Sequence, residues 1–143
     1  MNDFYAGKLL QNLYLFTINS PVNNVDPTGA SPADVTKIFR IFREKVDWMT
    51  QMEYRNPDPY YNNEMIALYI ISGGLLGKNY LGCGEQTYVV RGALIGNVFD
   101  DNWTFEAIIV DGGLHQMGKA HSANVSDPII YFDSWRDNIY KAE

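Results

Sequence analysis

The hydrophobic residues of this chain change their period once, and that change constrains the fold more than any other feature. Up to Asn97, apolar side chains recur three or four positions apart, which is typical of one face of a helix. Beyond the turn at residues 100–102 the period becomes two, as in a strand that buries one face. Helices followed by an antiparallel sheet predict an α+β layer arrangement.

Four stretches with helical spacing precede the turn at residues 100–102. In the clearest of them, Ser31 suits the N-cap and Pro32 the first helical position, and an apolar stripe runs over residues 35–49. Residues 64–72 leave almost no polar face, so we expect that helix to be buried on most sides. Two further helices are predicted over residues 6–16 and 83–97, and residues 20–30 are predicted to be a loop.

Three strands are predicted in the last third of the chain. The first covers residues 103–110 and ends at a glycine pair. A loop is expected over residues 112–119, and residues 121–125 and 129–133 are read as two strands joined by a short turn. The prediction is one domain over residues 1–143, with a helical part at 1–77 and the cysteine helix and sheet at 78–143.

Composition excludes several classes of protein. With 17 acidic and 11 basic residues the net charge is −6. Because a binding site for nucleic acid needs a concentrated basic surface, no nucleic-acid partner is expected. One cysteine excludes an internal disulfide, and two histidines beside it leave few ligands for zinc, so no metal or cofactor is expected. The apolar stretch near the N-terminus lacks a basic region and contains polar residues, so we expect neither a signal peptide nor a membrane interaction.

The residues that could carry chemistry are one thiol, one imidazole and one carboxylate. Cys83 precedes a helical pattern, where free backbone N–H groups stabilise a thiolate or an oxyanion. If the last two predicted strands pair with His121 opposite Asp133, the two side chains share a face of the sheet, and the carboxylate orients the base. His115 is the less favoured base, because it lies in a glycine-rich stretch and its pairing would fold back near Asn124 without a turn signal.

A structural role is the alternative for each of these residues. A lone cysteine is most often a small buried hydrophobic residue, a lone histidine is often a hydrogen-bonding group, and an aspartate can simply end a strand. Aromatic residues make up 14% of the chain, and exposed tyrosines and tryptophans are enriched at protein-binding surfaces. A non-catalytic α+β protein-binding module is therefore the second reading.

Three short motifs resemble the papain-like fold cysteine enzymes, in particular the small bacterial effector and polymorphic-toxin domains. They are Gly-Cys-Gly-Glu-Gln at 82–86, Ala-His-Ser-Ala-Asn-Val at 120–125 and Tyr-Phe-Asp-Ser-Trp at 131–135. The resemblance implies Cys83 as nucleophile, His121 as general base and Asp133 as orienting carboxylate. It further implies that Trp135 shelters the His–Asp pair. The papain proteases carry a glutamine about six residues before the cysteine to complete the oxyanion hole, and this chain has Gly77 there. We expect either Asn79 or a backbone N–H to take the place of that glutamine.

The same resemblance implies a function. It predicts a cysteine-dependent hydrolase, either a glutamine deamidase or a protease, that acts on a protein substrate. Such a toxin or effector module is secreted or delivered as part of a larger protein or by a secretion system, and an immunity protein restrains it in the producing cell. The residues up to Gly77 match no motif of these enzymes, so the resemblance leaves substrate recognition open.

Residues 82–86 also resemble the thioester motif of the complement and alpha-2-macroglobulin family. In that family the cysteine thiol and the glutamine side chain three residues later form an internal acylating bond. Those domains resemble large helical toroids about twice the length of this chain, and neither paired strands nor Asp-Ser-Trp belongs to them. An intact mass lower than the sequence mass by one ammonia would support this alternative.

Overall fold

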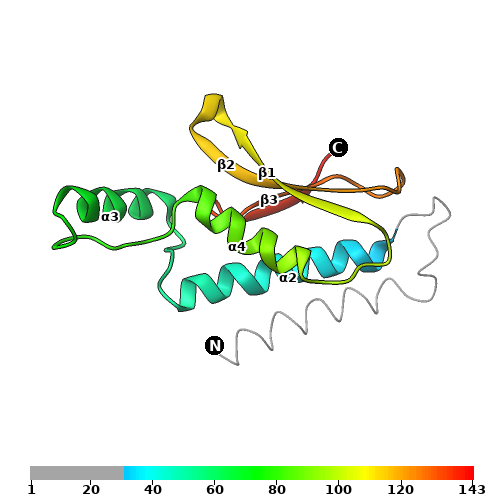
Figure 1. Ribbon diagram of the computed structural model, residues 1–143, viewed down its shortest axis with the longest axis horizontal. Helices are drawn as coiled ribbons and strands as arrows, with labels where there is room; N and C mark the ends of the chain where they lie inside the picture. The colour runs from blue at the N-terminus through cyan, green and yellow to red at the C-terminus, as the bar shows by residue number, and fades with distance from the viewer. Residues whose placement is uncertain (1–30) are drawn as a thin grey trace.

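A computed structural model describes residues 31–143 as helices followed by a sheet (Figure 1). The predicted α+β order is confirmed. The predicted helix at 6–16 and loop at 20–30 lie outside the described residues. The elements are α2 (Pro32–Gln51), α3 (Pro59–Ile71), α4 (Cys83–Ile95), β1 (Trp103–Val110), a short 3₁₀ turn η1 (Asp111–Gly113), β2 (His115–Ser122), β3 (Ile130–Asp133) and β4 (Asn138–Lys141).

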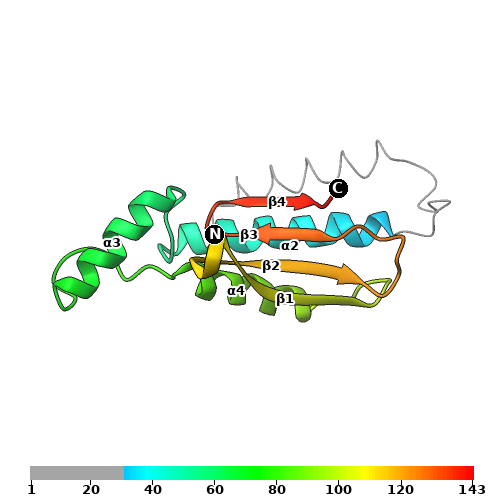
Figure 2. The same cartoon turned by 90° about the horizontal axis from the view of Figure 1, so that it is seen from above.

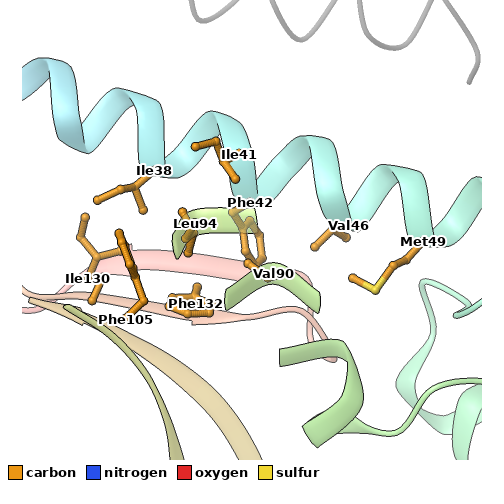
Figure 3. Packing of buried hydrophobic residues seen from close by; sticks show 11 residues of the cluster. Ile38, Ile41, Phe42, Val46, Met49, Val90, Leu94, Phe105, Ile130 and Phe132 are labelled. Atoms are coloured by element: carbon orange, nitrogen blue, oxygen red, sulfur yellow. The ribbon is translucent and has the colours of Figure 1, made fainter. Parts of the chain in front are cut away.

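The four strands form one antiparallel sheet in the order β1-β2-β3-β4, so each strand pairs with its neighbour in the sequence. Helices α2 and α4 run along the same face of this sheet (Figure 2). Between them and the strands lies the hydrophobic core (Figure 3), which consists of Ile38, Ile41, Phe42, Val46, Met49, Val90, Leu94, Phe105, Ala120, Ile130 and Phe132. Burial of this stripe and this sheet face holds the two layers together.

The start of α2 follows the predicted capping. The Ser31 hydroxyl accepts a hydrogen bond from the Asp34 backbone N–H at 3.4 Å, and Pro32 takes the first helical position. The buried Asp34 carboxylate then accepts from the backbone N–H groups of residues 100 and 101, at 2.8 Å each, and from the Trp103 indole at 2.9 Å. One carboxylate thus ties the first turn of α2 to the segment that enters β1.

Helix α3 is longer and far more exposed than the sequence pattern indicates. It begins at Pro59, where the Asp58 side chain accepts from the Tyr60 N–H, and of its residues only Asn62 is buried. The prediction that this helix is buried on most sides is wrong for the described residues. Both views show why, because α3 lies beyond one end of the sheet, away from the two helices that cover it (Figures 1 and 2).

The predicted loop over 112–119 is wrong for most of its length, because residues from His115 onward form β2. In the ladder, Gly118 lies between Ala107 of β1 and Phe132 of β3. A side chain at position 118 would overlap the Phe132 ring, so this glycine serves close packing inside a strand and not a turn. The strand predicted at 121–125 is correspondingly wrong, since β2 ends at Ser122.

The other strands are closer to expectation. The first predicted strand matches β1, and β3 begins one residue later than predicted. The sequence analysis missed β4, whose four residues pair with β3 at the edge of the sheet. Within residues 31–143, no helix combines the length and apolar character needed to cross a bilayer.

We predict opposite effects for two Gly→Ala substitutions. Gly118→Ala forces the new methyl group into the Phe132 ring and should lower the free energy of unfolding by about 2 kcal/mol or more. Gly92→Ala lies inside α4 with open space around it and should raise that energy by about 0.5–1 kcal/mol. Urea denaturation of both variants measures the effect. Equal tolerance at the two positions would contradict the close approach of Phe132 to β2.

Candidate functional site

Cys83 is the first residue of α4, as the sequence predicts, and its thiol is free and half-buried. Gly82 is the N-cap, and its backbone N–H donates to the Glu85 carboxylate at 3.1 Å. The backbone N–H groups of a first helical turn have no carbonyl partner within the helix, and the helix dipole is positive at this end. This position therefore favours a negative charge on the sulfur or on an oxygen bound beside it.

The buried side-chain amide of Gln86 fixes the start of α4. The Gln86 side chain is fully buried, donating from Nε2 to the Leu81 carbonyl at 3.0 Å and accepting at Oε1 from Arg55 Nε at 3.2 Å. Arg55 in turn donates from Nη1 to the Thr50 hydroxyl at the end of α2, at 2.6 Å. Both ends of the Gln86 amide are thus held by groups other than Cys83, which argues against the thioester alternative.

Arg55 is a residue that the sequence analysis missed. Its side chain is buried, and burial lowers the pKa of its guanidinium group. Among the described residues its Nη2 has no hydrogen-bond partner. A lone arginine gives no sequence signal for burial, because arginine is almost always exposed unless it is paired.

The structure brings His115 and Asp133 together. His115 Nε2 lies 2.7 Å from Asp133 Oδ2, and both side chains are almost completely buried. The other carboxylate oxygen, Oδ1, accepts from the Arg136 backbone N–H at 3.2 Å, which fixes the orientation of the carboxylate. With the carboxylate accepting from Nε2–H, the lone pair of the neutral imidazole is on Nδ1.

The predicted pairing of His121 with Asp133 is wrong. His121 faces Thr104 of β1 in the ladder, and its Nε2 lies 3.4 Å from the Glu106 carboxylate, where both side chains are exposed. Strands β2 and β3 pair with Gly118 opposite Phe132, so the connection between them is longer than the predicted three-residue turn. That register places Asp133 next to the start of β2 and away from its end.

The first turn of α4 lies against β2 at Gln116, the residue after His115. The Thr87 hydroxyl is hydrogen-bonded to the Cys83 carbonyl at 2.8 Å and to the Gln116 carbonyl at 3.3 Å. A side chain at Gly84 would overlap the Gln116 amide oxygen, so this second glycine allows α4 to approach the strand closely. The turn that begins at Cys83 therefore contacts Gln116, the residue after His115. Within residues 31–143 no hydrogen bond joins the thiol to the imidazole.

Arg136 links the pair to the turn before β2. Its Nη2 lies 2.9 Å from the Asp111 carboxylate and its Nη1 lies 3.8 Å from Asp133 Oδ2. The hydrogen bond to Asp111 raises the pKa of this guanidinium, and the Asp133 and Cys83 charges act in the same direction. The sequence analysis did not single out Arg136, and its only signal is its position three residues after Asp133.

The two remaining predicted residues differ in burial. Trp135 is buried two residues after Asp133, whereas Asn79 is exposed in the loop before Cys83. In the described part of the chain, no hydrogen bond joins either side chain to Cys83, His115 or Asp133. The prediction that Asn79 completes an oxyanion hole and that Trp135 shelters the pair therefore stays a prediction.

A pocket of about 390 Å³ lies at the other end of α4, where Arg91 and Ile95 face the residues that enter β1. Twelve residues of helix separate this end from Cys83, which corresponds to about 18 Å. Cys83, His115 and Asp133 do not line it. Among residues 31–143, no three His, Cys, Asp or Glu side chains are grouped so as to hold a metal ion.

Comparisons with protein-family models, with curated proteins and with solved structures gave no match for this chain. The evidence for the function is therefore the fold and the arrangement of Cys83, His115 and Asp133.

We predict that removing the two carboxylates that face histidines lowers the free energy of unfolding by unequal amounts. Asp133→Ala leaves a buried imidazole and a partly buried backbone N–H without their acceptor, and should lower the free energy of unfolding by about 3 kcal/mol. Glu106→Ala removes an exposed partner of His121 and should cost less than about 1 kcal/mol. Urea denaturation at neutral pH gives both values, and similar costs would contradict the burial of the His115–Asp133 pair.

Proposed function

We propose that this chain is a cysteine-dependent hydrolase in which Cys83 is the nucleophile, His115 the general base and acid, and Asp133 the carboxylate that orients the base. The observation that carries the proposal is the buried 2.7 Å contact between His115 and Asp133, where His115 precedes the residue of β2 that the first turn of α4 contacts. A thiol at a helix N-terminus, an imidazole and an orienting carboxylate are the three groups that thiol hydrolysis requires.

The chemistry follows from these groups. His115 Nδ1 takes the thiol proton, and the Cys83 sulfur attacks the carbonyl carbon of an amide to form a tetrahedral oxyanion. The imidazolium returns the proton to the leaving nitrogen as the C–N bond breaks, so ammonia or an amine departs and a thioester remains on Cys83. Water then attacks the thioester with His115 as base, and this step releases the acid and regenerates the thiol.

The environment supports both charged species. The first-turn N–H groups of α4 stabilise the thiolate and the oxyanion, and Asp133 stabilises the imidazolium that forms in each step. The contact of α4 with β2 at Gly84 and Gln116 keeps the sulfur-bearing turn beside the strand that starts at His115. The proposed mechanism requires the thiol and the imidazole to come within hydrogen-bond reach of each other when substrate binds, since catalytic hydrogen bonds often form fully only in the substrate complex.

The resemblance to papain-like toxin and effector domains supports a protein substrate. Exchanging His121 for His115 removes the Ala-His-Ser-Ala-Asn-Val motif from that resemblance and leaves Gly-Cys-Gly-Glu-Gln and Asp-Ser-Trp. On these two motifs we propose a papain-like glutamine deamidase or protease. We further propose delivery to a target cell, as part of a larger protein or through a secretion system, and restraint by an immunity protein in the producer.

Alkylation of Cys83 tests this proposal without a known substrate. Because His115 would take the proton from the sulfur, iodoacetamide should label Cys83 at neutral pH at least tenfold faster than it labels free cysteine. His115→Ala should remove that excess rate, and the matched control His121→Ala should keep it. A labelling rate that neither substitution changes would contradict the role of His115.

Turnover gives the second test. With glutamine-containing peptides as the probe and ammonia release as the readout, Cys83→Ala and His115→Ala should each lower the rate by at least about a thousandfold. The double variant should be little slower than either single variant, because the two groups act in the same step. His121→Ala should retain most of the activity. Activity that survives in Cys83→Ala would contradict the hydrolase proposal.

One observation favours the second candidate, a non-catalytic protein-binding module. Large apolar side chains are exposed on and around α3, including Ile70 and Ile71, and exposed apolar patches mark interaction sites. In that case Cys83 is structural, and its alkylation should be slow in the unmodified chain and in both histidine variants alike.

A further inference from the structure

The pocket of about 390 Å³ between the end of α4 and the start of β1 is separate from the candidate site. Its volume lies within the range of about 300–1,000 Å³ that is usual for small-molecule sites. Both views place the elements that form it at the end of the sheet opposite to α3 (Figures 1 and 2). Its lining combines an arginine, a carboxylate and aromatic rings, so it can be examined as a binding site.

Arg91 is the basic residue of this lining. Its Nε donates to the Phe105 carbonyl at 2.8 Å, which fixes the side chain against β1. Arg43 and Arg136 each have a carboxylate oxygen within 4.0 Å, whereas in the described part of the chain Arg91 is in no ion pair and its two Nη groups are in no hydrogen bond. In a chain with 17 acidic residues, an arginine that lines a pocket without a carboxylate partner can pair with an anion from outside.

The carboxylate of the lining, Asp101, is engaged by other groups. Its Oδ2 accepts from Asn124 Nδ2 at 3.2 Å, and a hydrogen bond with Asp127 raises its pKa. Neither Asn124 nor Asp127 lines the pocket, because both belong to the connection between β2 and β3. Arg91 is therefore the charged group of the lining that is left for a ligand.

Aromatic rings supply the apolar part of the pocket. Phe99 and Trp103 lie on either hand of Phe105, with ring centroids 5.4 and 6.4 Å from its own. The Trp103 indole N–H donates to the Asp34 carboxylate at 2.9 Å, which fixes the orientation of that ring. Lys37 Nζ lies 5.2 Å from the centroid of the Phe99 ring and adds a second positive charge near the pocket. The rings are thus held in place before any ligand arrives, which lowers the entropic cost of binding.

We propose that this pocket binds a small aromatic carboxylate. The carboxylate group pairs with the Nη groups of Arg91, since a guanidinium matches the two oxygens of a carboxylate, and the ring of the ligand lies against Phe99 and Trp103. An unpaired guanidinium and aromatic walls in one pocket favour a ligand that carries both an anionic group and a planar apolar body. The residues of the candidate site do not line this pocket, so the inference does not depend on the proposed hydrolase chemistry.

Binding of 2-naphthoate to the full chain tests the proposal, with the indole N–H signals of the tryptophans in an NMR titration as the readout. Only Trp103 lines the pocket, so its signal should shift most, while those of Trp48 and Trp135 serve as internal references. We expect a dissociation constant of about 1 mM or lower. The neutral analogue 2-naphthamide has the same rings without the charge and should bind at least tenfold more weakly.

Arg91→Gln should weaken the binding of 2-naphthoate at least tenfold and leave that of 2-naphthamide nearly unchanged, because only the charged ligand needs the guanidinium. Arg40→Gln is the matched control, since it makes the same change of charge on α2 outside the pocket, and it should leave both affinities unchanged. Thermal unfolding checks that each variant is folded. If Arg91→Gln does not fold, the comparison of acid with amide on the unmodified chain still decides.

Three results would overturn the proposal. They are equal affinity for 2-naphthoate and 2-naphthamide, a 2-naphthoate affinity that Arg91→Gln does not change, and no shift of the Trp103 signal at about 10 mM ligand. Tighter binding of the cation 2-naphthylmethylamine than of 2-naphthoate would also overturn it and would make Asp101 the group that selects the ligand.

Discussion

The close packing of the Phe132 ring on Gly118 is the contact on which the arrangement of the candidate site depends. It pins β3 against β2 in one register, and the side-chain period of two means that a slip by one residue would turn Asp133 to the other face of the sheet. The register then places the end of β3 beside the beginning of β2, which is where His115 lies. The imidazole–carboxylate pair therefore depends on a core packing contact that involves the residue before Asp133 and the third residue after His115.

Much of the fold could be predicted from the sequence because the signals were local. The Ser31 cap, the stripe of α2, the start of α4 at Cys83 and the alternation of β1 each depend on neighbouring residues. The register of β2 could not be predicted, because glycine at 118 carries the same sequence signal in a turn as in a strand that accepts an aromatic ring. That one ambiguity turned β2 into a loop and moved the expected base from His115 to His121. Burial of Arg55 and exposure of α3 were missed for a related reason, since both depend on contacts with residues far along the chain. Arg55 is bound by Gln86, and α3 lies beyond the end of the sheet.

Buried polar side chains connect different pairs of elements in this fold. Asp34 joins α2 to the entry of β1, and Gln86 with Arg55 joins the start of α4 to the end of α2. Each is a buried polar side chain that contacts a segment far along the chain, and each leaves a backbone or side-chain group unpaired if it is removed. The helix that bears Cys83 is consequently held by packing against β2 and by this amide, so the backbone at Cys83 keeps a defined position relative to the sheet.

Residues 56–80, which form α3 and its returning loop and are here called the α3 arm, leave and re-enter the rest of the chain at a single place, since the Leu81 N–H donates to the Tyr54 carbonyl at 2.8 Å. A segment whose two ends meet behaves as an insertion: its length and composition can vary while the flanking backbone keeps its course. Evolution can therefore exchange the arm for another without moving Cys83, although only one residue lies between Leu81 and that cysteine. The surface that the chain presents to other molecules and the arrangement of its candidate site are in this way free to change independently.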